Sequence, residues 1–279
     1  MNNLRIHAML AIIFIFATYV SFALQTDFVE IQKDSSSSNI LTESLVEVDI
    51  TAKNKKEKLK ELELLAENFT NKGLYNKAID VYNDILEQNL PKKKLFEYYV
   101  KIGDLYNLNK NYVYSISSYQ KALQIHKKNP QVIIKIGNIF SEQKLFILAE
   151  KEFTRALKID KHSVEATIGQ GNVLYKQGNY VEALKYYNKI SNKFSNREIV
   201  KNIADCYISL NRNNEAVAIL ESFLEEHNDS ELIFDLGRIY INRSDYNRAE
   251  DLFLKFLKTN NSNFKIYVYL GAVYDLNGK

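Results

Sequence analysis

The residues of this chain whose side chains could carry out chemistry are few, and their spacing argues against a catalytic or metal site. The 279 residues include one cysteine and four histidines. No two of the histidines have the spacing of metal ligands; they are His7, His126, His162 and His227. Because no cluster of acids, bases, nucleophiles or metal ligands stands out, we predict that the chain is not an enzyme and binds no cofactor and no metal.

Cys206 and a glycine-containing segment are the two other candidates for chemistry. Cys206 has no partner for an internal disulfide and falls in the middle of an expected helix, where a free cysteine is usually a small buried hydrophobic residue. The segment Gly169-Gln170-Gly171 is similar to the start of a dinucleotide-binding fingerprint, which requires a preceding strand. No strand is expected there, so we interpret Gly171 as a packing residue.

The composition favours a helical protein with a sizeable core and no dominant charge. Hydrophobic residues make up 46% of the chain, Gly (9) and Pro (2) are scarce, and Tyr (19) and Phe (15) are plentiful. Such a composition is typical of long helices that pack through aromatic side chains. The 37 basic and 34 acidic residues nearly cancel to a net charge of +3, which does not favour nucleic acid as the main partner.

Small residues recur along the chain with a period close to 34. The first series has successive spacings of 37, 34, 34, 33, 33 and 34 and consists of Ala66, Gly103, Gly137, Gly171, Ala204, Gly237 and Gly271. The second series lies twelve residues after each of the first six and consists of Ala78, Ser115, Ala149, Ala183, Ala216 and Ala249. Large side chains follow the first series by three residues and the second by four. This pattern predicts stacked helix pairs that cross closely at the small residues.

One segment of this pattern carries a family resemblance. Residues 171–187, with the sequence GNVLYKQGNYVEALKYY, closely resemble the consensus of the tetratricopeptide repeat family. The resemblance implies an all-α, right-handed superhelical solenoid of antiparallel helix pairs, with six repeats and a final helix, over residues 57–279. The repeats are expected near residues 59–92, 96–129, 130–163, 164–196, 197–229 and 230–263, with a partial repeat over 264–279.

The first 56 residues are expected to lie outside the repeats. An apolar run over residues 8–23 ends in Ser21-Phe22-Ala23, whose small residues suit a signal peptidase, so we predict a signal peptide over 1–23. An uncleaved membrane anchor is the alternative, because roughly 17 apolar residues are the lower limit for spanning a bilayer. Residues 24–56 are interpreted as a flexible tether. The expected location is the periplasm or cell envelope of a bacterium.

The resemblance also implies a concave groove lined by first-helix residues that packing does not use. The residues expected to contact an extended peptide or a partner's helix are Asn138, Asn172, Tyr175, Lys176, Lys201 and Arg238. Chaperone-binding members of the family hold a terminal carboxylate with asparagines and cations, and Asn138, Asn172 and Lys201 fall on matching positions. Ile134 and Asp205 stand where that clamp has cations, and an aspartate repels a carboxylate, so a clamp is not favoured.

The last expected helix, from Phe264 to Tyr274, is apolar around most of its circumference. A solenoid normally ends in a helix with a polar outer face, so we expect something to cover this one. The covering element could be a partner, a second copy of the chain, or repeats missing from a truncated reading frame. The hypothetical self-association surface consists of Tyr267, Val268, Tyr269 and Tyr274.

These features predict a non-catalytic protein–protein interaction scaffold or adaptor of the cell envelope. Its partner is expected to be a protein or peptide, and the membrane is expected as a partner only if the N-terminal segment stays uncleaved. One alternative is a nucleic-acid-binding helical repeat protein, because helical hairpins of similar length read RNA; the expected export and the balanced charge count against it. The other alternative is the targeting module of an enzyme complex.

Overall fold

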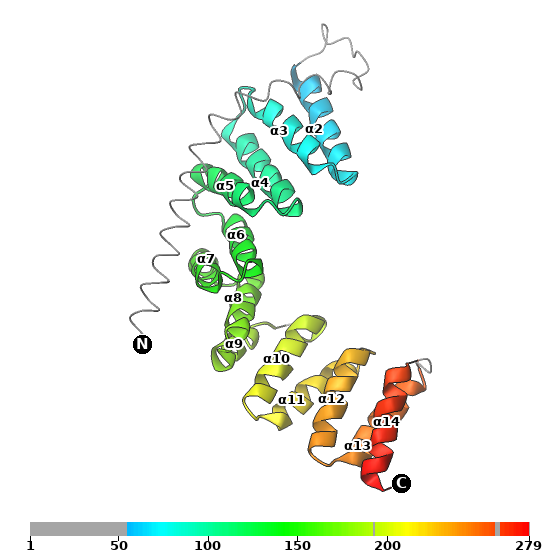
Figure 1. The fold of residues 1–279 in the computed structure, drawn as a ribbon. Helices are drawn as coiled ribbons and strands as arrows, with labels where there is room; N and C mark the ends of the chain where they lie inside the picture. Colours follow the sequence, from blue (N-terminus) through cyan, green and yellow to red (C-terminus); the bar gives the residue numbers. More distant parts are fainter. Residues whose placement is uncertain (1–54, 192, 260–262, 279) are drawn as a thin grey trace, which may run out of the picture. The chain divides into compact units, whose positions relative to one another are not determined.

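The computed structural model describes residues 55–191, 193–259 and 263–278, and every regular element within these ranges is a helix (Figure 1). The predicted signal segment and residues 24–54 of the predicted tether lie outside the described residues. The last two residues of that tether, Lys55 and Lys56, are instead the first residues of a helix. Within the described ranges, none of the helices combines the length and the apolar character needed to cross a bilayer. The chain divides into two compact units, residues 1–121 and 122–279, which are treated separately below.

The first unit is built from two helix pairs. Its helices are α2 (Lys55–Asn71), α3 (Tyr75–Leu86), α4 (Lys92–Leu108) and most of α5 (Tyr112–Ile125). The core between α2, α3 and α4 consists mainly of aliphatic and tyrosine side chains, among them Tyr82 and Tyr98, whose ring centroids are 5.8 Å apart. The pair α4 and α5 is held by Ser115, whose hydroxyl donates a hydrogen bond of 2.7 Å to the carbonyl of Gly103.

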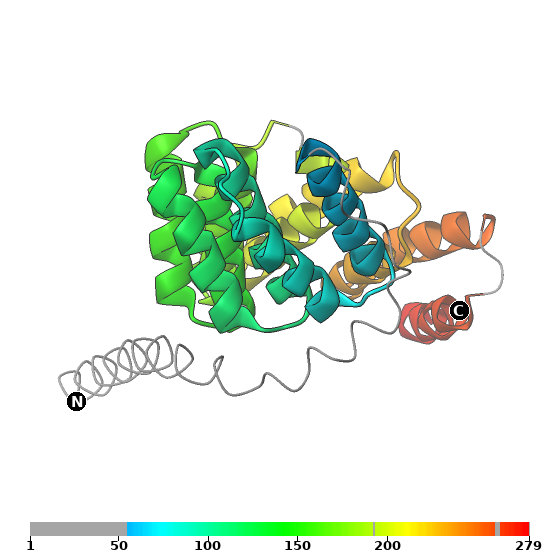
Figure 2. The ribbon, with the colours of Figure 1, turned by 90° about the horizontal axis from the view of Figure 1, so that it is seen from above.

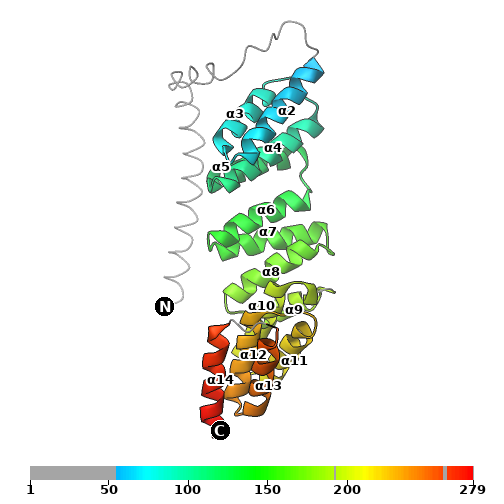
Figure 3. The same ribbon diagram turned by 90° about the vertical axis from the view of Figure 1, so that its right-hand side faces the viewer.

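The second unit continues the same alternation of first and second helices. Its first helices are α6 (Pro130–Glu142), α8 (Val164–Lys176), α10 (Arg197–Ser209), α12 (Ser230–Asn242) and α14 (Phe264–Asn277). Its second helices are α7 (Phe146–Ile159), α9 (Tyr180–Tyr187), α11 (Asn213–Leu224) and α13 (Tyr246–Leu257), and a short 3-10 turn, η2 (Lys193–Ser195), precedes α10. The first helices of this unit begin at the expected repeat starts, whereas α2 and α4 of the first unit begin four residues before the expected starts at residues 59 and 96. Figure 3 shows α6 to α9 as successive layers.

The small residues mark the places where two helices of a pair approach most closely. All six second-series residues have no exposed surface. A Cβ atom built on Gly103 would lie 2.5 Å from the Tyr119 ring, and one on Gly171 would lie 2.7 Å from the Tyr187 ring. Separations this short are repulsive in a close-packed interior. At these two positions glycine is favoured because an aromatic ring of the second helix fills the space that a side chain would need.

The turn between the two helices of a repeat contains one residue in the left-handed region. In the fourth repeat Gly178 has φ 78°, its N–H donates to the Tyr175 carbonyl at 2.9 Å, and the Asn179 N–H donates to the Leu174 carbonyl at 2.9 Å. These two bonds form a Schellman motif, which satisfies carbonyls at the helix end. The corresponding residues of the other repeats, with φ between 57° and 71°, are Gly73, Lys110, Lys144, Asn211 and Ser244.

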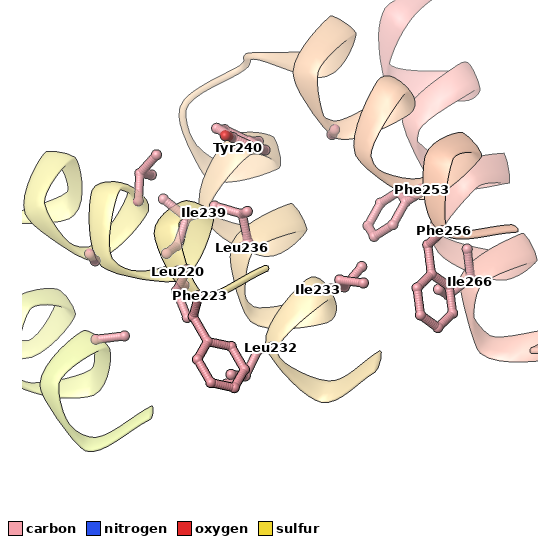
Figure 4. Close-up of a cluster of buried hydrophobic side chains, with 14 of the residues drawn as sticks. Leu220, Phe223, Leu232, Ile233, Leu236, Ile239, Tyr240, Phe253, Phe256 and Ile266 are labelled. Atoms are coloured by element: carbon pink, nitrogen blue, oxygen red, sulfur yellow. The ribbon is translucent and has the colours of Figure 1, made fainter. Parts of the chain in front are cut away.

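The second unit contains a continuous cluster of buried side chains from α10 to α14. Figure 4 shows Phe253 and Phe256 of α13 between Ile233 of α12 and Ile266 of α14, with Ile266 close to Phe256. Phe253 is completely buried and Phe256 is 4% exposed. Because burying one such side chain stabilises a fold by about 1.5–3 kcal/mol, this cluster fixes α14 against α13. In Figure 2, α14 (red) lies beside α13 (orange) at the edge of the unit.

Candidate binding surface

The six residues predicted to contact a partner all lie on first helices of the second unit. Asn138 is on α6, Lys201 is on α10, and Arg238 is on α12; the other three, Asn172, Tyr175 and Lys176, are on α8. Asn138, Lys176 and Arg238 are exposed, whereas the others are partly covered. The structure therefore places the predicted residues on equivalent helices but gives them different degrees of access to solvent.

Asn172 is held in place by hydrogen bonds inside the fold. The hydroxyl of the buried Tyr187 donates to Asn172 Oδ1 at 2.8 Å, and Asn202 Nδ2 donates to the same oxygen at 3.1 Å. A buried tyrosine hydroxyl needs a partner, and Asn172 provides it. Asn172 thus links α8, α9 and α10, and its carbonyl oxygen already accepts two hydrogen bonds before any ligand is present.

Tyr175 connects α8 to α10 at the next turn of the helix. Its hydroxyl donates a hydrogen bond of 2.9 Å to Asp205 Oδ2, and its ring lies 6.1 Å from the ring of Tyr180. Burial and the bond to the Asp205 carboxylate both raise the pKa of Tyr175. Asp205 occupies a position where the carboxylate clamp has a cation, and its carboxylate here accepts a hydrogen bond from a neutral hydroxyl. Ile134, at the other such position, is completely buried and cannot contact a ligand.

A network of ion pairs joins α10 to α12. Lys201 Nζ bonds to Glu231 and lies 3.8 Å from Asp235 Oδ2, while Arg197 bonds to both Asp229 and Glu231. The hydrogen bonds from Lys201 and then from Arg197 lower the pKa of Glu231 from 4.5 to about 2, and the bond to Glu231 raises the pKa of Lys201. Each cation of α10 therefore already has a carboxylate partner from the following repeat.

Asp235 lies between two cations and is more covered than they are. Its side chain is 17% exposed, and Arg238 Nη2 lies 3.0 Å from its Oδ1 on the other side from Lys201. Burial raises the pKa of Asp235, and the nearby carboxylates of Asp205 and Glu231 raise it further, against the opposing effect of the two cations. Arg238 itself remains 57% exposed, so it can contact a ligand while paired.

We name a set of six charged side chains on α8, α10 and α12 the first-helix face. It consists of Lys176, Arg197, Lys201, Glu231, Asp235 and Arg238. The sequence prediction missed Arg197, Glu231 and Asp235 because it considered positions within each first helix and not charged residues of the adjacent first helix. A usable signal was present, since Arg197 and Glu231 are one repeat apart, at the start of consecutive first helices.

The four residues predicted to form a self-association surface divide into two pairs. Tyr267 and Val268 are 49% and 54% exposed on α14. Tyr269 instead packs its ring against Phe234, at 5.3 Å between centroids, and against Phe253, at 6.0 Å. Tyr274 is half-buried against the same cluster. These two tyrosines therefore contribute to the core of the second unit.

The side chains that could have carried out chemistry pack within the fold. Burial raises the pKa of the Cys206 thiol to about 12, and Gly169 and Gly171 lie inside α8, where rings of the neighbouring helices cover them. His227 stacks on Phe223 with 4.2 Å between ring centroids. In the part of the chain that the structure describes, no group of three or more potential metal ligands comes together.

Two segments match the family profile described as tetratricopeptide repeat, residues 135–194 and residues 202–230. A comparison with curated proteins gives no match. Among solved structures, a tetratricopeptide repeat protein from Parabacteroides merdae is 20% identical, with 89% of this chain and 95% of that chain covered and a TM-score of 0.53.

Two further solved structures are similar in fold. PilF of Pseudomonas aeruginosa is 17% identical, with 67% of this chain and 86% of that chain covered and a TM-score of 0.55. YrrB, described as a tetratricopeptide repeat protein with an unusual peptide-binding site, is 16% identical, with 67% and 95% covered and a TM-score of 0.54. The all-α helix pairs, the two profile matches and these folds agree with each other. Residues 135–194 and 202–230 therefore match tetratricopeptide repeats, and the described helix pairs share the fold of tetratricopeptide repeat proteins.

Proposed function

We propose that this chain is a non-catalytic scaffold that holds an extended peptide or a partner's helix across α8, α10 and α12. The observation that carries the proposal is the first-helix face, where exposed charges of both signs are fixed by bonds between consecutive repeats. Tyr175 to Asp205, Lys201 to Glu231 and Arg197 to Asp229 each connect neighbouring first helices. A surface whose charged groups are already positioned loses less side-chain entropy on binding.

The pairing of these charges defines the ligand chemistry. A single terminal carboxylate would have to displace Glu231 or Asp235 from Lys201, and it would meet Asp205 nearby. A segment with alternating basic and acidic residues instead finds a partner for each charge without breaking the existing pairs. We therefore expect a ligand of mixed charge, and we expect its affinity to fall as salt rises because the pairs on this face are exposed.

The similar proteins support this class of function. The structure of YrrB is described as having an unusual peptide-binding site, and tetratricopeptide repeat proteins in general bind proteins or peptides. Capture of the bound protein in the native host would identify the partner and the assembly to which the complex belongs.

Site-specific photo-crosslinking tests where the partner binds. A photoreactive amino acid at Lys176 or Arg238 should form adducts with a bound protein or peptide. The same amino acid at Val181, which is 54% exposed on α9, is the control and should form few adducts. Adducts at Val181 with none at the other two positions would place the partner on the second helices and contradict the proposal.

Charge reversal tests whether the first-helix face supplies the affinity. Arg238→Glu should weaken capture of the crosslinked partner by at least about tenfold, because it replaces the cation paired with Asp235 by a second acid. Arg155→Glu on α7 is a matched control, since Arg155 is 45% exposed and pairs with Glu152 at 3.1 Å across one helix turn. Equal capture by the two variants would remove Arg238 from the binding surface.

We infer in addition that the scaffold acts outside the cytoplasm, in the cell envelope. The inference depends on the apolar segment and small-residue cleavage site within residues 1–23. N-terminal sequencing of the mature protein from its native host should give Leu24 as the first residue. An intact Met1 with the protein in the membrane fraction would favour the uncleaved anchor, and an intact Met1 in the cytoplasm would contradict export.

A further inference from the structure

We propose that the first unit docks on a membrane surface that carries anionic lipids, through the turns that join the helices of its two pairs. The surface involved is the turn edge, which we define as residues 70–77, around the turn from α2 to α3, and residues 107–114, around the turn from α4 to α5. The contact does not use the N-terminal segment. It belongs to the unit that does not carry the first-helix face, so it is independent of the proposed partner site.

The two turns lie next to each other in the first unit. Asn109 Nδ2 donates a hydrogen bond of 2.8 Å to Asn76 Oδ1 and so links the second turn to the start of α3. In Figure 1 the turn from α2 to α3 and the turn from α4 to α5 lie on the same side of the unit. Both turns are closed by the same pair of Schellman backbone bonds, all between 2.8 and 2.9 Å. The turn edge is therefore a defined surface built from two ordered turns.

Four apolar side chains of the turn edge are exposed. Leu108 is 55% exposed, Leu74 is 43% exposed, Val113 is 42% exposed and Tyr114 is 40% exposed. The Tyr114 ring stacks on the ring of Tyr106, with 5.3 Å between centroids, which fixes the orientation of an exposed aromatic ring. Apolar side chains gathered at one place on a soluble surface mark an interaction site. Tyrosine in particular is enriched where proteins meet the interface of a bilayer.

The charged residues of the turn edge are all lysines. Its two eight-residue segments contain Lys72, Lys77 and Lys110, and neither contains an aspartate or a glutamate. All three lysines are exposed. The nearest acids in sequence lie three residues outside the segments, within the helices, and two of them, Glu67 and Asp104, already bond to other groups of the unit. The turn edge is therefore positively charged and complementary to an anionic surface.

The turns of the second unit differ from the turn edge in their charge. The segments at the same distance from the small residues of the first series are 141–148, 175–182, 208–215 and 241–248. Each of them contains one acid, and these are Glu142, Glu182, Glu215 and Asp245. Two of these segments also expose an aliphatic side chain, Ile147 and Val181, so apolar exposure alone does not separate the units. Among these six turns, only the two of the first unit combine lysines and exposed apolar residues with the absence of acids.

This combination fits the interface of a bilayer with anionic lipids. Each lysine close to such a surface contributes roughly fivefold to the affinity. The exposed apolar side chains stand at two neighbouring turns, so they can enter the interface together while the lysines stay among the headgroups. Because only three lysines and four apolar side chains take part, we expect weak, reversible and peripheral binding that falls as salt rises.

An environment-sensitive fluorophore on single cysteines of the full chain tests the contact. Labelled Val113→Cys should show a blue shift with vesicles of equal amounts of phosphatidylcholine and phosphatidylglycerol, and a much smaller shift with phosphatidylcholine alone. Val181→Cys is the matched control, because each valine is the second residue of a second helix, and it should show no shift. The native Cys206 is completely buried and should stay unlabelled. No shift at Val113, or equal shifts at the two positions, would overturn the proposal.

Charge removal tests the role of the lysines. In the labelled chain, Lys110→Gln should weaken binding to the same anionic vesicles roughly fivefold, and adding Lys72→Gln should weaken it further. Lys144→Gln is the matched control, because Lys110 and Lys144 hold the same turn position with φ 59°, and it should leave binding unchanged. Circular dichroism checks the fold of each variant. Unchanged binding by the double variant would contradict the proposal.

Photo-crosslinking in the native host separates a lipid surface from a protein partner at the turn edge. A photoreactive phenylalanine in place of Tyr114 should form adducts with phospholipid, because this ring is exposed beside the lysines. The same amino acid in place of Val181 is the control and should form no lipid adducts. Protein adducts at position 114 in place of lipid adducts would assign the turn edge to a protein partner and overturn the proposal.

Discussion

The first helices α12 and α14 have equivalent positions in consecutive repeats but different surroundings. In α12, Gly237 lies against the ring of Phe253, Asp229 caps the helix, and ion pairs join it to α10. In α14, a Cβ atom built on Gly271 would meet nothing within 4 Å, the Asn263 side chain makes no capping bond, and Phe264 is 78% exposed. This difference shows that a small residue in a first helix indicates a second helix that packs against it.

The largest expected difference between the two regions concerns phenylalanine. Phe253→Ala removes a completely buried ring and should lower the free energy of unfolding by about 3–5 kcal/mol. Phe264→Ala removes an exposed ring and should change it by less than about 0.5 kcal/mol in the monomer. Urea denaturation at low protein concentration measures both. Similar losses for the two variants would mean that α14 is covered within the chain.

Glycine substitutions give the next largest contrast. Gly171→Ala should destabilise by about 1–3 kcal/mol, because the added Cβ lies 2.7 Å from the Tyr187 ring and that ring is held by its hydrogen bond to Asn172. Gly271→Ala should stabilise the monomer by up to about 1 kcal/mol, since alanine is the better helix former and no atom opposes it. Thermal denaturation of the two variants should therefore shift in opposite directions.

A smaller contrast is expected between two asparagines that precede first helices. Asn129 Oδ1 accepts a bond of 3.0 Å from the Val132 N–H, so Asn129→Ala should cost about 1 kcal/mol of stability. Asn263→Ala should cost almost nothing, because Asn263 makes no capping bond. Equal effects in urea denaturation would show that the start of α14 is capped in the same way as the start of α6.

The smallest effect concerns the pH dependence of the contact between α10 and α12. The pKa of Glu231 is lowered from 4.5 to about 2 in the folded chain, so its stabilising effect is present above pH 4.5 and is lost as pH falls toward 2. Because the pair is exposed, we expect less than about 1 kcal/mol. Glu231→Gln should remove this part of the acid sensitivity, measured as the difference in unfolding free energy between pH 6 and pH 3. An unchanged difference would mean that the pair contributes nothing.

Most of the fold could be predicted from the sequence because helix crossings require small residues. The two series of small residues predict the helix pairs. The expected repeat starts coincide with the starts of α6, α8, α10, α12 and α14. The left-handed turn residues were harder to predict. Lys110, Lys144, Asn211 and Ser244 adopt positive φ without being glycine, which the Schellman bonds of the turn impose and residue type does not show.

The binding surface could be predicted only in part. The sequence identifies which helix turns face away from the core, so Lys176 and Arg238 were found as exposed residues. It does not show that Asn172 is used by Tyr187 and Asn202, because that depends on side chains 15 and 30 residues away. The sequence signal for this contact is a tyrosine at a core position, because a buried tyrosine hydroxyl needs a hydrogen-bond partner. In the same way, Tyr269 was placed on the surface although Phe234 and Phe253 cover it.

Hydrogen exchange tests most directly the claim that repeat packing covers α12 more completely than α14. Amide protection should be higher over α12, whose Gly237 lies against the Phe253 ring, than over α14. Equal protection over the two helices would contradict the account.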